Sequence, residues 1–481
     1  MNNNIKKKQK PEVFIELDVV SAGFNGVSVA RSEGMVYFVQ GAVPGDRVNA
    51  KVLKKKKSYV ECKTVEVIIP SPHRIEPICD HFAYCGGCTR QHFEYSEQTK
   101  WKALNVVESF TRLHKVEVGE FVEILSSPKI YEYRNKMEFS FSDRRWLTPE
   151  EMGDKSREEN PIEDKHFALG LHVSGAYDKV LEVNYCHLQT QKANEIFDLT
   201  KKLCKDNGIT AHNVRSHSGL LRNLVIRYSK LEDNYMVILI TNPTEDKTEL
   251  EFVDLWAKSI NDLGYVASTI YATKERNSPV KIIEYKTLYG KDYLLEDILG
   301  VKFQISPFSF FQTNPIQLDN FIKYILEFSE LNSDEILWDL YCGTGSISLP
   351  AASSVKKVIG LELVEDSIED AKKNAKLNNF ENTEFYAVDL HTKNLPEIFK
   401  ILQIPDNIII DPPRAGIHNN VIDHLLELEV PKITYVSCNP TTMARDCELL
   451  SAKYDIIKIK PVDMFPQTYH IEAIAQLRLK K

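Results

Sequence analysis

The chain has 481 residues, of which 43% are hydrophobic and 27% charged; this is ordinary for a soluble globular protein and more than a single core usually holds. No stretch is long and apolar enough to span a bilayer, and the polar, lysine-bearing first residues do not have the pattern of a secretory signal. We therefore expect two or three domains and a cytoplasmic protein with no membrane partner, whose nine cysteines serve metal binding or catalysis.

Charge is distributed unevenly along the chain. The net charge is −8, yet residues 1–69 carry 12 Lys and Arg against 7 Asp and Glu, an excess of +5. The densest run is Lys54 to Lys57. A basic segment on an otherwise acidic chain favours a polyanion as partner, although four lysines in a row are also typical of a solvated turn.

Residues 11–70 contain a succession of short strands. Residues 35–39 are apolar and β-prone, residues 47–52 alternate between apolar and polar, and residues 59–69 form a further β-prone run after a turn. Several short strands separated by glycine turns are typical of a small barrel. We predict an N-terminal all-β, OB-like barrel over 11–70, followed by a proline-marked linker.

The central region, residues 73–305, has a mixed pattern that predicts an α+β domain. In it Cys79, Cys85 and Cys88 are spaced C-x5-C-x2-C around two glycines, and Cys186 is the candidate fourth ligand. Four thiolates suit either a tetrahedral zinc ion or a [4Fe–4S] cluster, and the spacing does not choose between them. The highly charged stretch 150–165 is expected to be an exposed insertion.

From residue 306 to 481, strands and helices alternate, which predicts a Rossmann-like α/β domain with a parallel sheet. A glycine loop around Gly343 and Gly345 follows the first strand, and Glu362 ends the second, 19 residues beyond Gly343. An acidic residue there accepts hydrogen bonds from a ribose diol. Because the loop lacks a P-loop lysine and a full dinucleotide pattern, we predict an adenosine cofactor without pyrophosphate, namely S-adenosylmethionine.

Further polar residues are predicted at the carboxyl ends of strands. Asp389 follows a third strand, Asp411 follows an isoleucine-rich fourth strand, and Cys438 follows a fifth that Pro440 prevents from continuing. Open α/β sheets bind ligands at this edge. Cys438 is therefore a candidate nucleophile.

Over nearly its whole length the chain resembles the RNA uracil-5 methyltransferases. The motifs that carry the resemblance are FFQTN (310–314), DLYCGTG (339–345), DPPR (411–414), SCNP (437–440) and HIE (470–472). The resemblance implies that the barrel is a TRAM domain and that the four cysteines hold a [4Fe–4S] cluster. It implies contacts to S-adenosylmethionine from Gln312, Tyr341, Glu362, Asp389 and Asp411.

The resemblance also implies a catalytic pair, with Cys438 as nucleophile and Glu472 as general base. Carbon 5 of uracil is a poor nucleophile until a thiolate adds to carbon 6, and a base must afterwards remove the proton from carbon 5. The barrel and the cysteine cluster together favour the RlmD-type branch, which acts on 23S ribosomal RNA. We expect a monomer with RNA as its partner.

Three alternatives remain open at this point. The first is a tRNA uracil-5 methyltransferase. The second is an adenine or guanine amino-methyltransferase, but those enzymes usually have an aromatic residue where this chain has Arg414. The third is an RNA-binding or ribosome-assembly factor that retains a cofactor fold, which the presence of both Cys438 and Glu472 argues against.

Overall fold

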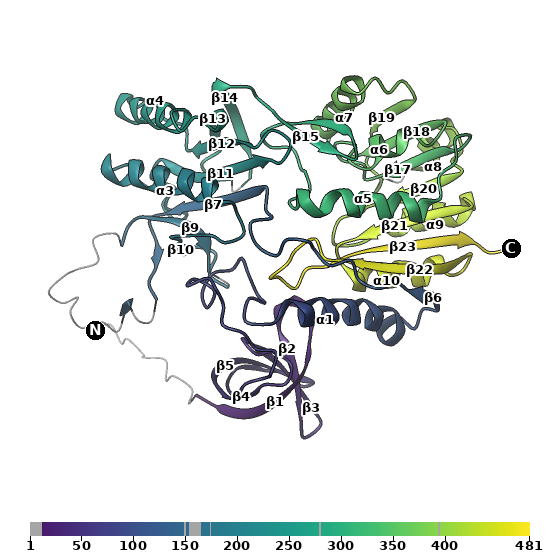
Figure 1. The fold of residues 1–481 in the computed structure, drawn as a ribbon, viewed down its shortest axis with the longest axis horizontal. Helices are drawn as coiled ribbons and strands as arrows, with labels where there is room; N and C mark the ends of the chain where they lie inside the picture. Colours follow the sequence, from purple (N-terminus) through teal and green to yellow (C-terminus); the bar gives the residue numbers. More distant parts are fainter. Residues whose placement is uncertain (1–11, 149–150, 153–164, 174, 279, 393–394) are drawn as a thin grey trace, which may run out of the picture. The chain divides into compact units, whose positions relative to one another are not determined.

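The computed structural model of the protein describes residues 12–148, 151–152, 165–173, 175–278, 280–392 and 395–481; most of the charged stretch 150–165 lies outside these ranges. The chain divides into two compact units (Figure 1). The first comprises Met1–Ala83, Cys88–Asn105 and Gln467–Tyr469, and the second comprises Tyr84–Gly87, Val106–Pro466 and His470–Lys481. The domain limits 11–70, 73–305 and 306–481 stay predictions.

The first unit contains a closed five-stranded barrel in the order β1-β2-β3-β5-β4. Its strands are β1 (Phe14–Ala22), β2 (Ser28–Ser32), β3 (Met35–Gln40), β4 (Arg47–Lys55) and β5 (Tyr59–Ile69). Alternate side chains such as Val48 and Ala50 are fully buried inside it, as the period of two in a strand requires. The predicted N-terminal barrel is thus confirmed. Helix α1 (Tyr95–Glu108) begins in this unit.

An eight-stranded mixed sheet occupies the middle of the chain, in the order β14-β13-β12-β11-β7-β9-β10-β8. Its strands are β7 (Lys136–Ser142), β8 (Arg145–Trp146), β9 (Ala168–His172), β10 (Val180–Glu182), β11 (Leu221–Ser229), β12 (Asn234–Thr241), β13 (Val266–Lys274) and β14 (Ile282–Gly290). The helices α3 (Gln191–Asp206) and α4 (Lys247–Asn261) begin at Thr190 and Asp246, whose side chains accept backbone N–H bonds. Such caps satisfy donors that a helix start leaves open.

A second eight-stranded sheet, in the order β19-β18-β17-β20-β21-β23-β22-β6, forms the C-terminal part. Its strands are β6 (Val118–Phe121), β17 (Ile336–Leu340), β18 (Lys357–Glu362), β19 (Thr383–Ala387), β20 (Asn407–Ile410), β21 (Lys432–Ser437), β22 (Tyr454–Val462) and β23 (Glu472–Leu479). Strands β17 to β21 are parallel, whereas β23 is antiparallel to β21. This confirms the predicted Rossmann-like α/β domain, although its sheet is mixed, because β23 is antiparallel to both β21 and β22.

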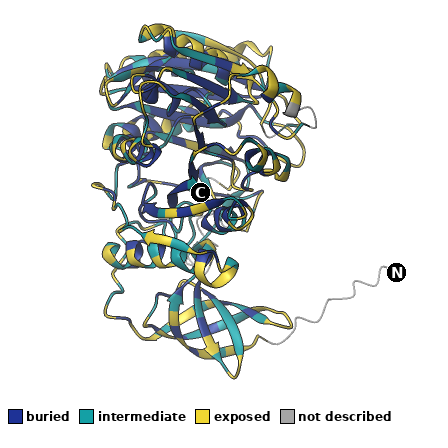
Figure 2. Cartoon of the chain, turned by 90° about the vertical axis from the view of Figure 1, so that its right-hand side faces the viewer, coloured by how far each residue is buried: buried dark blue, intermediate teal, exposed yellow. Residues whose placement is uncertain are grey.

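Helices cover both faces of this sheet. They are α5 (Pro315–Ser329), α6 (Ser348–Ala352), α7 (Glu365–Leu377), α8 (Leu395–Ile401), α9 (Asn419–Leu428) and α10 (Pro440–Leu450). Along β20, Ile408 and Ile410 pack in one core cluster and Ile409 in another, so the strand is buried on both sides, as parallel strands are. Figure 2 shows the buried residues following the strands, while the helices carry exposed residues on their outer faces.

The hairpin of β15 (Leu294–Ile298) and β16 (Val301–Ile305) leads into the segment before α5. On β16 the N–H of Gln304 donates to the side chain of Asn374 of α7, and the N–H of Lys302 donates to the side chain of Asn378, the C-cap of that helix. Asparagine side chains thus take the place of a further strand and hold the hairpin along α7.

Candidate active site

The sheet order defines where a ligand fits. After β17 the chain moves to β18 on one side, and β20 later pairs with β17 on the other side. The carboxyl ends of β17 and β20 therefore form a topological switch point, and open α/β sheets bind ligands in the crevice at that point.

The loop after β17 has a backbone conformation that lets a ligand approach the main chain closely. Tyr341, Gly343 and Gly345 all have positive φ angles, of 66°, 53° and 84°. For tyrosine this conformation costs on the order of 1 kcal/mol, and the N–H groups of Tyr341 and Cys342 hold it by donating to Leu361 O at 2.8 and 3.1 Å.

Glu362, at the end of β18, lies beside this loop. Its Oε2 accepts from the N–H of Gly343 at 3.2 Å, and its Oε1 accepts from the N–H groups of Leu363 and Val364 at 2.8 and 3.0 Å. The carboxylate is therefore fixed in orientation at the edge of the loop. A carboxylate in this place has the chemistry to accept from a ribose diol.

Asp389 lies next to the end of the same strand, because the N–H of Val388 donates to Glu362 O at 2.7 Å. Asp389 is exposed, and its Oδ1 accepts from the N–H of His391 at 2.9 Å. The structure thus brings Tyr341, Glu362 and Asp389 together at the ends of β17, β18 and β19.

Two acids lie close together at the switch point itself. Burial raises the pKa of Asp339 to about 7, although Ser348 Oγ donates to its Oδ2 at 2.5 Å. Burial, and after it the charge of Asp339, raises the pKa of Asp411 to about 7. Asp411 directly follows β20, with its N–H donating to Leu340 O at 3.2 Å.

Cys438 and Glu472 meet at the same edge of the sheet. Because β21 and β23 are antiparallel neighbours, with Ser437 opposite Ala473, the end of one strand lies beside the start of the other. Burial, then the charges of Glu472 and Asp411, raise the pKa of Cys438 to about 11. Burial, followed by the charge of Asp411, raises the pKa of Glu472 well above its usual range.

Arg414 is the positive group at this edge, and its guanidinium lowers the pKa of both Cys438 and Glu472. Its Nη2 also lies 3.4 Å from Nδ1 of His470, two residues before Glu472. Sequence reasoning did not assign it a functional place. The available signal was its position directly after Asp411 and two rigid prolines.

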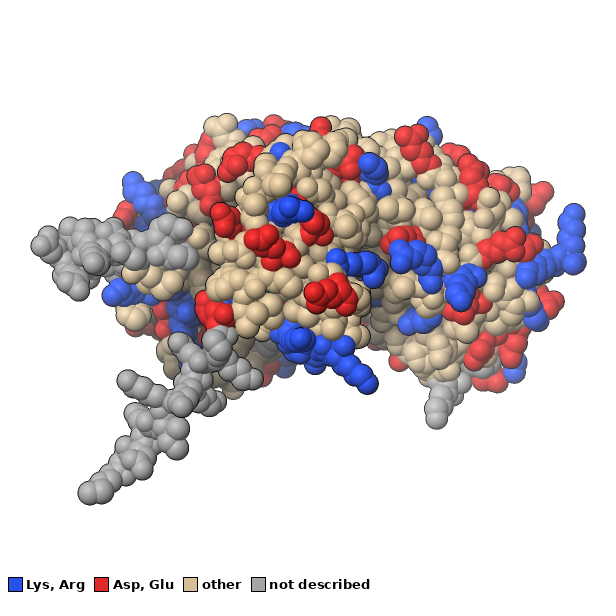
Figure 3. Space-filling view, turned by 90° about the horizontal axis from the view of Figure 1, so that it is seen from below, with Lys and Arg blue, Asp and Glu red and all other residues tan. Residues whose placement is uncertain are grey.

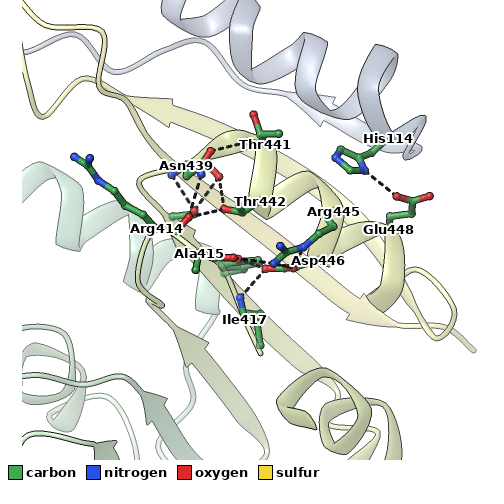
Figure 4. A network of polar contacts seen from close by, with 12 residues as sticks. His114, Arg414, Ala415, Ile417, Asn439, Thr441, Thr442, Arg445, Asp446 and Glu448 are labelled. Atoms are coloured by element: carbon green, nitrogen blue, oxygen red, sulfur yellow. Dashed lines mark hydrogen bonds and ion pairs between the residues drawn. The ribbon is translucent and has the colours of Figure 1, made fainter. Parts of the chain in front are cut away.

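A network of polar contacts holds the loop that carries Arg414 (Figure 4). The carbonyl of Arg414 accepts from Asn439 Nδ2 at 3.0 Å and from Thr442 Oγ1 at 3.3 Å. Asn439 also caps α10 by accepting from the N–H of Thr441. The loop after β20 is therefore fixed to the first turn of the helix that follows Cys438.

Asp446 anchors the rest of this loop. Its Oδ2 accepts from the N–H of Ile417 and from Tyr435 Oη, both at 2.7 Å, and Arg445 pairs with its Oδ1 at 2.6 Å. Gly416 packs so closely that a Cβ there would lie 2.4 Å from the carboxylate, and its φ is +84°. Both facts require glycine at this turn.

Gln312 is the one predicted cofactor residue for which the described structure gives no contact to the others. It is half-buried, and its carbonyl accepts from Asn135 Nδ2 at 3.1 Å. It precedes α5, which Asn314 caps by accepting from the N–H of Gln317.

The predicted metal centre is not assembled in the structure. Within the described ranges, no three His, Cys, Asp or Glu side chains are gathered as a metal ion requires. Cys79 and Cys88 belong to the first compact unit, whereas Cys85 and Cys186 belong to the second. The four cysteines are therefore divided between the two units, although three of them lie within ten residues of one another in the sequence. No disulfide joins cysteines in the described part of the chain.

Two of the four cysteines, Cys79 and Cys85, lie beside backbone N–H groups. The N–H of Gly87 points at Cys85 Sγ, at 3.4 Å. Burial raises the pKa of Cys79, and backbone N–H groups of His81 and Phe82 oppose that shift. Such N–H···S bonds tune cysteine thiolates that hold iron–sulfur clusters, so the donor chemistry fits such a group.

Fold and site together define an α/β enzyme with a nucleoside cofactor and a strand-end thiol. Residues 280–480 match the family model described as tRNA (Uracil-5-)-methyltransferase. An uncharacterized RNA methyltransferase of Bacteroides thetaiotaomicron is 39% identical over 456 residues, which are 95% of this chain and 99% of that protein. Another, of Porphyromonas gingivalis, is 37% identical over 96% of this chain and 99% of its own length.

A solved structure agrees with these relatives. The tRNA (uracil-54, C5)-methyltransferase of Pyrococcus abyssi, crystallised with S-adenosyl-L-homocysteine, superposes with a TM-score of 0.71 at 25% identity. The match covers 96% of this chain and 100% of that one. The chain belongs to the S-adenosylmethionine-dependent RNA uracil-5 methyltransferase family, and the prediction of an RNA methyltransferase is confirmed. In the described part of the chain, no helix combines the length and apolarity that a membrane crossing needs.

Proposed function

We propose that this protein methylates carbon 5 of a uridine in RNA through a covalent bond between Cys438 and the base. The observation that supports this most is the meeting of a thiol, a carboxyl group and a guanidinium at one sheet edge, in Cys438, Glu472 and Arg414. These are the groups that the reaction needs as nucleophile, base and charge partner.

The cofactor residues are proposed from their places around the switch point. Glu362 would accept from the ribose hydroxyls, and Tyr341 and Asp389 would flank the adenosine, beside the glycine loop that allows close approach. Gln312 and Asp411 would complete the site near the methyl group. When bound, S-adenosylmethionine supplies a methyl group on a positively charged sulfur.

The proposed reaction has three steps: addition of the thiolate, transfer of the methyl group, and removal of the proton from carbon 5. Cys438 Sγ, as thiolate, forms a bond to carbon 6, and the electron pair of the 5,6 double bond moves into an enolate. Carbon 5 then forms a bond to the methyl group with the electron pair of the enolate; the pair of the broken sulfur–methyl bond would stay on the sulfur of the cofactor, which loses its charge. Glu472 accepts the proton from carbon 5, the double bond reforms, and the bond between sulfur and carbon 6 breaks.

Arg414 would supply the charge that the first step requires. With a pKa of about 11, the Cys438 thiol is only a little ionised near neutral pH, and the guanidinium is the group that favours its thiolate. The clamp by Asn439, Thr442 and Asp446 keeps the Arg414 loop in place for this task.

For the substrate we propose 23S ribosomal RNA, with a transfer RNA as the second candidate. The combination of the barrel with the spacing of Cys79, Cys85, Cys88 and Cys186 supports the first. The second is supported by the Pyrococcus abyssi neighbour, whose name gives a tRNA substrate and whose match covers 96% of this chain. A barrel by itself therefore does not discriminate between the two. RNA binding by the barrel and the TRAM assignment stay predictions.

Trapping with 5-fluorouridine tests the function and the choice of RNA together. A base cannot remove fluorine from carbon 5, so the methylated covalent complex is expected to persist on a denaturing gel when S-adenosylmethionine is present. Substituted 23S ribosomal RNA and tRNA transcripts would be compared side by side. Absence of a shifted band with both, in protein that methylates unsubstituted RNA, would contradict the covalent mechanism.

We also propose that Cys79, Cys85, Cys88 and Cys186 hold one [4Fe–4S] cluster, supported by the four-thiolate donor set and by the backbone N–H groups beside Cys79 and Cys85. Protein purified without oxygen is expected to be brown and to contain about four irons per chain. Cys186→Ser should lower that iron content, whereas Cys204→Ser, at a buried cysteine outside the set, should not. About one zinc per chain and no iron would rule the cluster out.

A further inference from the structure

A hollow of about 440 Å³ opens in the second compact unit, and none of the residues proposed for catalysis or cofactor binding lines it. It lies at one end of the mixed sheet, where β7 and β11 meet the loops after β9, before β11 and after β13. Its volume falls within the roughly 300–1,000 Å³ that small-ligand pockets occupy.

Among the described residues, no carboxylate pairs with either of two arginines in its wall. Arg222, only 9% exposed, donates to Asn242 Oδ1 at 2.9 Å and to the carbonyls of Arg276 and Ser278 at 3.2 and 2.9 Å. Arg276 donates to two more backbone carbonyls. All of these acceptors are neutral, so the positive charge of both guanidiniums is left for an anion.

The remaining titratable groups do not cancel this charge. Asp178, which also lines the hollow, already accepts from both Arg144 and Arg215. Burial and the charge of Arg222 lower the pKa of His212 to about 4, so this ring is neutral near neutral pH. The hollow therefore carries net positive charge, as a phosphate site does.

An aromatic ring completes the wall. Tyr177 is 79% exposed although it is a large side chain, and it lines the same hollow. Guanidiniums beside an exposed aromatic ring are the combination that binds single-stranded RNA, where phosphates pair with arginine and unstacked bases lie on a ring. Over the face that Figure 3 shows, acidic and basic side chains of the described residues are interspersed.

Strands β7 and β11 run side by side from the hollow toward the segment that carries Gln312. On neighbouring strands Ser140 lies opposite Asn223, and Lys136 lies opposite Arg227. From Asn223 to Arg227, four residues along β11, the distance is about 13 Å. A stretch of about four nucleotides, stacked about 3.4 Å apart, has the same length.

The other end of this strand pair lies beside the segment that precedes Gln312. Arg227 Nη2 donates to the carbonyl oxygen of Ser309 at 2.5 Å, and Ser309 lies three residues before Gln312. Between these ends the exposed Glu138 lies opposite the buried Val225, and Arg227 itself is only 4% exposed. The hollow itself, and not the strands beyond it, is therefore the place for a phosphate.

We propose that this hollow binds a nucleotide of the substrate RNA on one side of the methylated uridine, with its phosphate on Arg222 and Arg276 and its base on Tyr177. This rests on the proposed function, because it assigns the second nucleotide subsite of the same RNA. The expected recognition is of single-stranded RNA without strong base preference, because every base presents a face for stacking.

The test measures binding of fluorescein-labelled dodecauridylate by the full-length protein at several salt concentrations. The Tyr177→Ala, Arg276→Ala double variant is expected to bind roughly tenfold more weakly, with a salt slope lower by about 0.7 for the lost phosphate contact. The control is Lys247→Ala, which removes one positive charge at an exposed position of α4 outside the hollow. This variant should bind the oligonucleotide like the wild type. S-adenosylmethionine affinity should be equal in all three.

Two results would contradict the binding of RNA in the hollow. Wild-type affinity in the double variant, or no binding of dodecauridylate by the wild type, would overturn it. If the double variant unfolds early, Tyr177→Ala alone serves, since the exposed ring contributes little to the core. Crosslinking of 4-thiouridine oligonucleotides should then label the peptide containing Tyr177 in the wild type. A failed 5-fluorouridine trap with intact pocket-dependent binding would instead remove the proposed methylation mechanism and leave the pocket standing.

Discussion

Replacing Cys438 by alanine is expected to lower RNA methylation by at least roughly 10⁴-fold, because removal of a nucleophile abolishes the step on which all later steps depend. The affinity for S-adenosylmethionine should stay near that of the wild type, since the proposed cofactor residues Tyr341, Glu362 and Asp389 lie at the ends of other strands. Methyl transfer to RNA and equilibrium binding of S-adenosylmethionine would be measured on one preparation.

The matched control is Cys447→Ala, which removes a fully buried thiol from α10. It should lower stability and leave turnover largely intact. In the wild type, covalent complex formation should rise by about tenfold per pH unit well below the pKa of Cys438 of about 11, because only the thiolate adds to the base. Normal turnover by Cys438→Ala would refute the covalent mechanism.

Replacing Glu472 by glutamine should slow methylation by about 10²–10⁴-fold, the usual contribution of a general base, while the covalent RNA complex still forms. The amide is nearly isosteric but cannot take the proton from carbon 5, so the methylated complex should accumulate. A denaturing gel with labelled RNA, read over time, would show a band that the wild type resolves quickly.

Glu448→Gln makes the same chemical change at an exposed ion pair with His114 and should behave like the wild type. The pH dependence has a definite sign. Because the pKa of Glu472 is raised, the carboxylate is lost as pH falls, and release of the complex should slow toward acid in the wild type. An unshifted gel together with unimpaired turnover in Glu472→Gln would exclude this residue as the base.

Much of the architecture follows from short-range patterns. Alternation with a period of two over 47–52, together with glycine turns, is enough to indicate the N-terminal barrel. Runs such as Ile408 to Ile410, apolar on both faces, indicate strands of a covered parallel sheet. Pro440 ends a strand directly after Cys438, so the strand-end position of the thiol is also readable from the sequence.

The cofactor loop is local in the same sense. Gly343, Gly345 and Glu362 lie within one strand, loop, helix and strand unit, and the structure joins Glu362 to the loop by the N–H of Gly343. Their proximity is a consequence of chain connectivity, because parallel neighbours joined by one helix bring their carboxyl ends together.

What surrounds the thiol was decided only by tertiary structure. Glu472 reaches Cys438 because β23 inserts antiparallel beside β21, and no local pattern determines strand order. Arg414 acquires its place through Asp446 and Asn439, 32 and 25 residues further along the chain. The raised pKa values of Cys438 and Glu472 follow from burial and from charges on different strands. Composition and spacing determine which groups the chain carries; only the packed sheet determines which of them share a low-dielectric site, and that proximity sets their chemistry.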